Sequence, residues 1–152
     1  MAFGVGNPLV QQGLLNRVLT HVIVPGFAPL SVTASNMSKS LALLAFNEDA
    51  VDQIGTATGL VNSPAPYVLG DLTVNILRSQ IVASLYYAQW QANAIIGSVI
   101  AYPDSTVLGP FILSNCSILR VDPGAFDGQD PTTKVTIKGI YYLNAAMWAG
   151  LP

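Results

Sequence analysis

The sequence predicts a mainly β fold, an antiparallel β-sandwich or small barrel flanked by one α-helix, in a single domain of 152 residues. Three observations predict it. Short segments of alternating polar and apolar residues recur along the chain. Clusters of Pro, Gly, Asp and Asn separate these segments, as expected for turns. Only one stretch, residues 79–93, is both long enough and free enough of Gly and Pro to form a helix.

The predicted helix is the centre of a strand–helix–strand unit. Asp71–Leu77 alternates with a period of two, and Ser79 offers a hydroxyl at the position of a helix N-cap. Ile95–Tyr102 returns to β character and stops at Pro103. Residues 79–102 contain no charged side chain. A helix with a solvated face normally carries Lys or Glu there, so we expect other protein to cover both sides of this helix.

The first part of the chain is expected to be an arm followed by short strands. Residues 1–16 are loosely patterned, and we expect a partner to order them as an N-terminal arm. Three short β segments and the breaks between them are expected next. The strands are 17–24, 30–34 and 41–46, and the breaks are 25–29 and 35–38.

Residues 47–69 sustain neither a helical nor a strand period. The segment contains Glu48, Asp49 and Asp52, followed by Gly, Thr and Pro residues. Connections of about 20 residues without regular structure are uncommon in compact domains and are usually functional or bound to a partner. The segment is therefore predicted to be an extended loop that reaches a neighbouring subunit, and its three carboxylates are candidate interface residues.

The last third of the chain predicts an antiparallel hairpin. Phe111–Val121 and Thr132–Tyr142 alternate as strands, and the turn formers of residues 122–131 join them. On the second strand Val135, Ile137 and Tyr141 are expected on one face, and Lys134, Thr136 and Lys138 on the other. Residues 143–152 are expected to form a short apolar latch.

The composition indicates a protein that buries its surface against copies of itself. Hydrophobic residues make up 51% of the chain and charged residues 9%, against about 25% charged in typical soluble domains. No apolar run is long enough for a transmembrane helix, so no membrane insertion is expected. No basic segment that could begin a signal peptide opens the sequence. Obligate interfaces are apolar and poor in charge, which favours an obligate oligomer.

No catalytic, cofactor or metal site is predicted, and an enzyme is not expected. The only histidine, His21, has no sequence partners for a catalytic triad. The acidic residues of 48–52 and of 122–130 lack the spacing of a calcium loop. The net charge is −2 and the six Lys and Arg residues are scattered, which argues against tight binding of nucleic acid. Cys116 is the single cysteine, which excludes an intramolecular disulfide.

Aromatic residues on the predicted helix are candidates for contact with a partner. Tyr86 and Trp90 are four residues apart and share a face, and Tyr87 lies beside it. Ile81 and Leu85 share another face. We expect the second face to pack on the chain's own sheet, and Tyr86, Tyr87 or Trp90 to meet a neighbouring subunit.

Four segments together resemble the tail tube proteins of contractile-tailed bacteriophages. They occur in the same order over nearly the whole chain, and none is a catalytic motif. The segments are Val61–Val68, Thr73–Gln80, Gly97–Val99 followed by Pro103-Asp104, and Ser114–Ile118.

The resemblance implies a tail-tube fold like that of type VI secretion inner tubes, assembled into hexameric rings. Such rings stack into a hollow tube that conducts DNA during ejection. The implied partners are other copies of the chain, the tail sheath protein, the tape measure protein and DNA in the lumen, and the baseplate and tail-terminator proteins. The implied location is the tail of the virion, after assembly in the host bacterial cytoplasm.

Within such a tube, polar strand faces are expected to line the lumen, and Thr73, Asn75 and Thr136 are the candidates. The arm of residues 1–16 and the loop of residues 47–69 are expected to join successive rings. Two alternatives stay open: a baseplate or capsid-decoration protein of similar fold, and a small-ligand-binding β-barrel.

Overall fold

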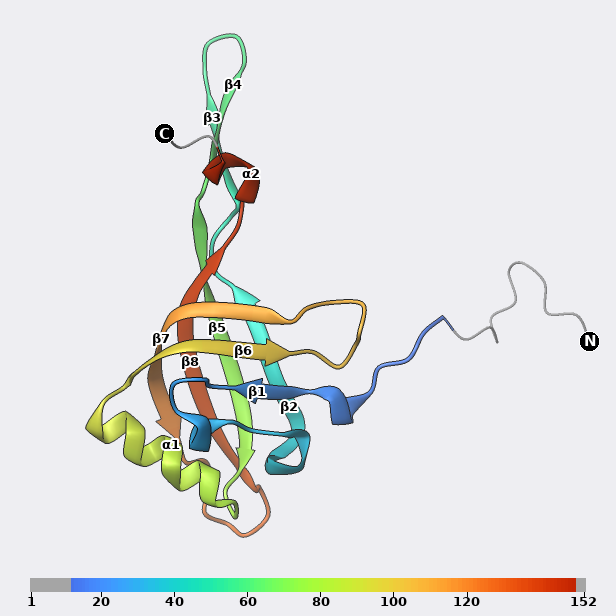
Figure 1. Cartoon of the computed structure of the whole chain (residues 1–152), viewed down its shortest axis with the longest axis vertical. Coiled ribbons are helices and arrows are strands. Elements are labelled where there is room, and N and C mark those ends of the chain that lie inside the picture. Colours follow the sequence, from blue (N-terminus) through green and yellow to red (C-terminus); the bar gives the residue numbers. More distant parts are fainter. Residues whose placement is uncertain (1–11, 150–152) are drawn as a thin grey trace, which may run out of the picture.

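The computed structural model describes residues 12–149, and in it a six-stranded antiparallel sheet curls into a half-barrel (Figure 1). The strand order is β1-β6-β7-β8-β5-β2, and a separate two-stranded hairpin, β3–β4, stands at one end of the molecule. The fold is thus mainly β, but it is one curled sheet and not a sandwich of two. The strands are β1 His21–Ile23, β2 Met37–Phe46, β3 Val51–Gly55, β4 Leu60–Pro64, β5 Tyr67–Leu77, β6 Ile95–Tyr102, β7 Phe111–Asp122 and β8 Thr132–Tyr142.

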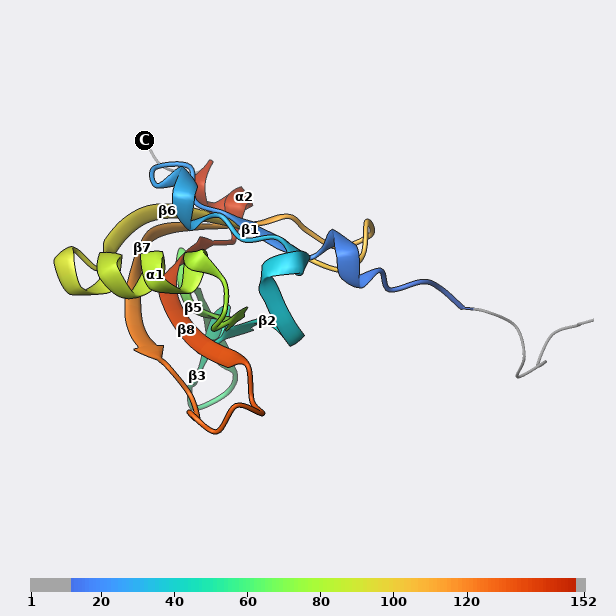
Figure 2. The same cartoon turned by 90° about the horizontal axis from the view of Figure 1, so that it is seen from below.

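The curl of the sheet has local causes in the sequence. Gly97 on β6 (φ 79°) and Asn115 on β7 (φ 51°) both adopt left-handed backbone conformations where the strand registers shift. Such bulges increase the bend and twist of a sheet. Gly70 on β5 lies directly opposite Gly139 on β8, so two neighbouring strands lack side chains at one level. Figure 2 shows the result, a sheet that wraps around its own core.

Gly139 permits the close approach of β7 and β8. A Cβ atom at this position would overlap the sulfur of Cys116 and lie 3.1 Å from the Ser114 carbonyl oxygen. β8 continues through Gly139 without a break.

Gly139→Ala is expected to lower the free energy of unfolding by about 2 kcal/mol, as overpacking of a core does, measured by urea denaturation. A Cβ atom at Gly70 would lie 3.2 Å from its nearest neighbour, the side chain of Phe46 on the edge strand. The free energy of unfolding should therefore fall less in the matched variant Gly70→Ala. Equal losses in the two variants would contradict the overlap with Cys116.

The core fills the inner side of the curl. β5 alternates buried and half-buried residues along most of its length, as the period of two predicts. Helix α1 (Ile81–Ala92) closes this side and contributes Val82, Ala83 and Tyr86. The largest fully buried side chains are Tyr86, Leu72, Ile76, Ile96, Leu113, Ile118 and Ile137.

The predicted strand–helix–strand unit is confirmed as β5–α1–β6. β8 and β7 lie between its two strands in the sheet, so α1 bridges strands that are not neighbours. The expected cap is wrong: Gln80, not Ser79, is the N-cap residue, and no side chain caps the helix.

The short strands expected near the N-terminus are only partly correct. Arg17–Leu19 forms a 3-10 turn, and the side chain of Asn16 accepts a hydrogen bond from the Val18 amide (3.1 Å). Within 30–34 only Val32 pairs, in a single bridge with Val22. The break expected at 35–38 is correct in its first half, because Ala34–Asn36 forms a 3-10 turn, but β2 already begins at Met37. A second irregularity lies at Leu41, where φ is 53° and the register of β2 shifts. Residues 12–16 are extended and exposed, and residues 1–11 of the expected arm lie outside the described residues.

The segment 47–69 is not an irregular loop, and this prediction is wrong. It contains β3, β4 and the start of β5, because Val51, Ile54 and Val61 favour strands. The turn is held by Thr56, whose amide donates to the Gly59 carbonyl (2.8 Å) and whose hydroxyl accepts from the Gly59 amide (3.1 Å).

Candidate assembly surfaces

The β3–β4 hairpin projects along the long axis of the molecule, beyond the half-barrel (Figure 1). All ten of its strand residues are exposed. Its strands pair only with each other within the described residues. Four of its side chains are large, apolar and more than a third exposed: Val51, Ile54, Leu60 and Val61. An isolated two-stranded hairpin is at best marginally stable in water, so this hairpin has the character of a docking element.

The base of the hairpin is tied to the C-terminal part of the chain by Asn144. Its side-chain amide donates to the carbonyl oxygens of Ala50 (3.1 Å), just before β3, and Ala65 (2.5 Å), just after β4. The short helix α2 (Ala145–Trp148) follows, and the Trp148 ring lies edge-on against Tyr142 with centroids 6.0 Å apart. Part of the expected apolar latch is therefore a clasp at the root of the hairpin, and residues 150–152 lie outside the described residues.

The outer face of the sheet is polar around Thr73 and Thr136, although the exposed Leu43 of β2, the cross-strand partner of Thr73, lies on the same face. Thr73 lies directly opposite Thr136, and Asn75 opposite Lys134, so the three lumen candidates share this face. Thr73 and Asn75 are half-buried, whereas Thr136 on the central strand is 4% exposed and its hydroxyl has no hydrogen-bond partner among the described residues. Thr136 is thus shielded by its neighbours and presents little surface of its own.

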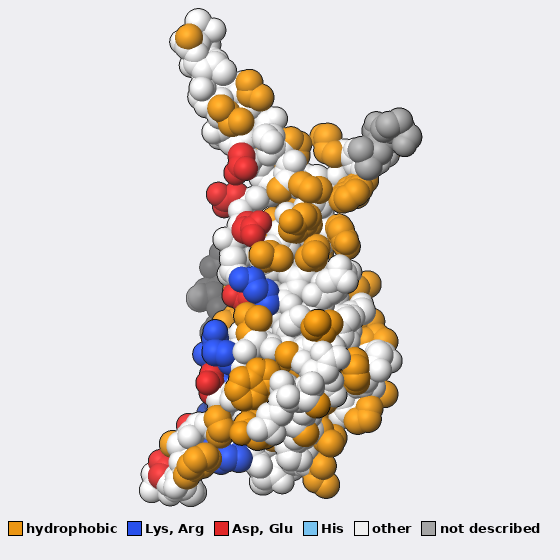
Figure 3. Space-filling model, turned by 90° about the vertical axis from the view of Figure 1, so that its left-hand side faces the viewer, with side chains coloured by type: hydrophobic (Ala, Val, Ile, Leu, Met, Phe, Trp, Pro, Cys, Tyr) orange, Lys and Arg blue, Asp and Glu red, His pale blue; other side chains and the backbone are white. Residues whose placement is uncertain are grey.

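Charged side chains surround these three residues. Asp71 accepts from the Asn47 side-chain amide (2.8 Å) and lies 4.0 Å from the Lys138 ammonium. The strand registers add Lys134, Arg120 and Asp122 to the same face. In Figure 3 charged side chains follow one margin of the molecule from the root of the hairpin to the opposite end, while hydrophobic side chains predominate elsewhere. On the face seen in Figure 3, the charged side chains are therefore concentrated along one margin.

The acidic candidates Glu48, Asp49 and Asp52 lie on β3 and just before it. All three are exposed, and none forms an ion pair within the described residues. They place three negative charges at the root of the hairpin, where residues 47–66 carry no Lys or Arg.

Helix α1 faces the core with a different side than expected. Tyr86, predicted to meet a neighbouring subunit, is fully buried in the chain's own core, whereas Ile81 is 77% exposed. The reason is that Val82, Ala83 and Tyr86 occupy one face and pack there as a group. Tyr87 is exposed and Trp90 half-buried, and their rings are 5.9 Å apart. The exposed part of α1 carries no charge, so it remains a candidate interface.

Ala88 provides a direct test of the uncharged face. Because Ala88 is exposed on α1, Ala88→Lys is expected to change the midpoint of thermal unfolding by no more than a few degrees. A charge in an apolar contact is costly, so the same variant should lose most of its assembly, measured by sedimentation velocity. Ala88→Ser is the neutral control. Wild-type assembly by Ala88→Lys would show that this face is free.

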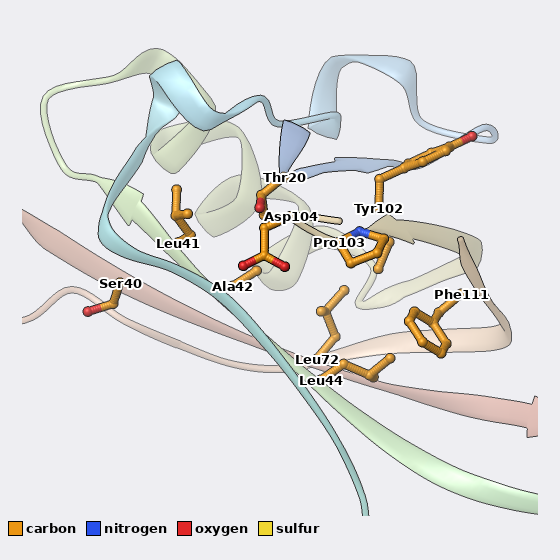
Figure 4. A pocket seen from close by; sticks show the side chains of 11 residues that line it. Thr20, Ser40, Leu41, Ala42, Leu44, Leu72, Tyr102, Pro103, Asp104 and Phe111 are labelled. Atoms are coloured by element: carbon orange, nitrogen blue, oxygen red, sulfur yellow. The ribbon is translucent and has the colours of Figure 1, made fainter. Parts of the chain in front are cut away.

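A cleft lies between β2 and the β6–β7 connection, at the opening of the half-barrel. Its volume is about 230 Å³, and Leu44 and Leu72 form part of its apolar floor. Figure 4 shows the Asp104 carboxylate between Thr20 and Ala42, inside the cleft. Typical small-molecule sites are larger, about 300–1,000 Å³, so the cleft does not favour the ligand-binding alternative.

His21 lies on β1, an edge strand of the sheet. Its Nδ1 lies 2.6 Å from the Leu19 carbonyl oxygen, and its ring stacks on Tyr102 with centroids 4.1 Å apart. Asp127 is equally local: the amides of Gln129 and Asp130 donate to its carboxylate and hold its pKa below the usual range. Among residues 12–149 no three His, Cys, Asp or Glu side chains converge as metal ligands. None of the helices described is long and apolar enough to cross a membrane.

Two buried titratable groups predict a loss of stability in alkali. Burial raises the pKa of the Cys116 thiol to about 11 and raises the pKa of Tyr86 above its ordinary value. Both groups ionise at lower pH in the unfolded chain, so stability should be complete below pH ~9 and then fall by up to ~1.4 kcal/mol per pH unit for each group. Urea denaturation from pH 7 to 11 measures this.

Tyr86→Phe separates the two contributions. The hydroxyl of Tyr86 has no hydrogen-bond partner among the described residues, so its removal should cost less than about 0.5 kcal/mol at pH 7. The variant should also lose the part of the decline that begins near pH 10. An unchanged alkaline profile in Tyr86→Phe would contradict this assignment.

Two structural residues were not foreseen from the sequence. Arg78, directly after β5, donates through its guanidinium to the carbonyl oxygens of Pro123 (2.7 Å), Thr132 (3.2 Å) and Asp130. Asn144 was included in the latch without a role. The sequence signals were an isolated Arg beside a charge-free stretch, and an Asn at a strand end, a residue that tolerates φ above zero.

The fold and these surfaces define a mainly β protein with a curled sheet and a projecting hairpin. No protein-family model matches the chain, and no curated protein matches it as a sequence relative.

Proposed function

We propose that this chain is a structural subunit of the inner tail tube of a contractile-tailed bacteriophage. Copies assemble into hexameric rings, and the rings stack into a hollow tube that conducts DNA during ejection. The proposal rests on the resemblance of four sequence segments to tail tube proteins and on three surfaces of the subunit: the hairpin, the open sheet edge and the polar outer face.

The hairpin is the observation that carries the proposal. It exposes four large apolar side chains and touches little of its own domain. Exposed apolar surface of this kind marks protein interaction sites. Because the hairpin lies parallel to the long axis and at one end (Figure 1), it suits contact between stacked rings.

Lateral assembly uses the edge of the sheet. β2 is an edge strand, and no described strand pairs with its free backbone edge. Its side chains Leu43 and Phe46 are 63% and 41% exposed. Open edges invite pairing with another chain. Pairing of this edge with the next copy, repeated around a rotation axis, closes a ring and removes the edge.

The polar outer face then lines the lumen. Asp71, Asp122, Arg120, Lys134 and Lys138 give it three positive and two negative charges. Tight phosphate binding needs a strongly basic surface, so this mixed face lets DNA slide. The uncharged side of α1 is left for a neighbouring subunit or the sheath.

Negative-stain electron microscopy and sedimentation velocity of the purified chain test the proposal. We expect hexameric rings and tubes of stacked rings. Monomers across the accessible concentration range would overturn it. Rings that never stack would favour the alternative of a baseplate subunit, for which the same lateral surfaces serve.

A further inference from the structure

Helix α1 and the turn that joins β7 to β8 lie at the end of the molecule opposite the hairpin (Figure 1), and a groove lies between them. Its volume is about 290 Å³. Ala83, Ser84 and Tyr87 of α1 form one wall, and Val121 and Pro123 form the other. The lining is mostly apolar, and the groove is open to solvent along one side.

The second wall of the groove is held in place before anything binds. The Arg78 guanidinium donates to the Pro123 and Thr132 carbonyl oxygens on the two sides of the turn, and it lies 5.5 Å from the centre of the Phe126 ring. A groove whose walls are fixed in advance loses little entropy when it is filled.

The two ends of the molecule differ in charge: the hairpin root is acidic, and the opposite end carries charges of both signs. The root of the hairpin carries Glu48, Asp49 and Asp52, which form no ion pair within residues 12–149. At the other end Lys39 and Lys134 are exposed at the starts of β2 and β8 and likewise form no ion pair in the described chain. The end of β7 and the β7–β8 connection add the exposed carboxylates of Asp122, Asp127 and Asp130 at this end. The two unpaired lysines are the groups at this end that suit the acidic root of another copy, and pairing with them would favour one orientation of contact.

The hairpin presents an apolar pair that suits the groove. Ile54 and Val61 are direct cross-strand partners, so they share one face, and they are 54% and 53% exposed. Strands of five residues extend about 17 Å. The pair therefore stands well clear of the half-barrel and can enter a cavity on another molecule.

We propose that the hairpin of one copy inserts Ile54 and Val61 into the groove between α1 and the β7–β8 turn of the next copy. This inference rests on the proposed function and names the acceptor that the hairpin requires. Donor and acceptor lie at opposite ends, so the contact is head-to-tail. Such a contact does not close on itself and produces an open stack.

Disulfide cross-linking tests the contact. A double variant, Ile54→Cys with Ser84→Cys, places one thiol on the hairpin and one in the groove, and both positions are exposed. The native Cys116 is fully buried and does not interfere. After mild oxidation a non-reducing gel should show a ladder of dimers, trimers and higher species, which reduction abolishes.

The matched control moves the hairpin thiol to its other face. Asn62 pairs with Gln53, one residue from the Ile54–Val61 pair and on the opposite side. Asn62→Cys with Ser84→Cys should give at least tenfold less cross-linked product. Equal ladders from both double variants, or dimers alone, would overturn the proposal.

A groove-filling variant separates this inference from the proposed function. Ser84→Trp should abolish stacking while rings persist in electron micrographs. If the wild type and Ser84→Trp both form tubes and the cross-linked ladder is absent, the proposed groove contact is refuted, whereas the proposed function as a tube subunit is retained. If the wild type never forms tubes, both fail.

Discussion

Replacement of Val51–Pro64 by a two-residue Asn-Gly turn is expected to abolish tubes and leave folded subunits or single rings. The cut is made where the chain already closes, because the Ala65 amide donates to the Ala50 carbonyl oxygen (2.8 Å). All the removed strand residues are exposed, so the core keeps its packing. The midpoint of thermal unfolding should therefore change by no more than a few degrees.

A point variant controls for the altered chain length. Ile54→Lys keeps the hairpin and places a charge on its exposed apolar face, so it should reduce stacking by at least tenfold in sedimentation assays. Long tubes formed by the hairpin-less variant would show that rings are joined elsewhere.

Arg78→Ala is expected to have the largest effect on stability of any surface change. Its guanidinium hydrogen-bonds three carbonyl oxygens of the β7–β8 turn and its flanks, and hydrogen bonds to charged groups contribute about 1.5–3 kcal/mol each when partly buried. Because Arg78 is only half-buried, we expect a total loss of about 3 kcal/mol in urea denaturation.

Arg78→Lys is the matched control for charge. A lysine keeps the positive charge but lacks the planar fork that reaches several acceptors at once, so it should recover less than half of the loss. Hydrogen exchange at the Gln129 and Asp130 amides should accelerate in both variants. If Arg78→Ala lowers the free energy of unfolding by less than about 0.5 kcal/mol, the conformation of the β7–β8 turn does not depend on Arg78.

The sequence predicts the central strands well because both of its signals agree there. β6 and β8 begin and end at the predicted residues, and β7 differs by one residue at its end. In these strands alternation coincides with burial on one face, and Pro, Gly or Asp marks the ends. The curl of the sheet was not predictable, because it depends on bulges at Gly97 and Asn115 whose partners lie on other strands.

The hairpin β3–β4 was missed for a physical reason. Neither of its faces packs on the domain, so its residues carry no alternation to detect. Tyr86 was misplaced because an aromatic stripe on an uncharged helix does not reveal which side meets the sheet. Only the packing of Val82 and Ala83 beside it decides the orientation.

For the candidate surfaces too, the sequence predicts what residue types show and misses what long-range packing creates. The acidic residues at the hairpin root and the polar strand face were identified from residue types alone. The Arg78 contacts and the Asn144 clasp join residues 45 to 94 positions apart. The groove likewise combines α1 with residues near the end of β7 and the start of β8, and no local pattern encodes such contacts.

Cryo-electron microscopy of the purified assembly tests the central claim most directly. The account predicts stacked sixfold rings in which the face of β5 and β8 that carries Thr73, Asn75 and Thr136 lines the lumen, and in which the hairpin of each subunit contacts the next ring. A tube with this face packed in a dry interface or turned outward, or a preparation containing only monomers, would contradict it.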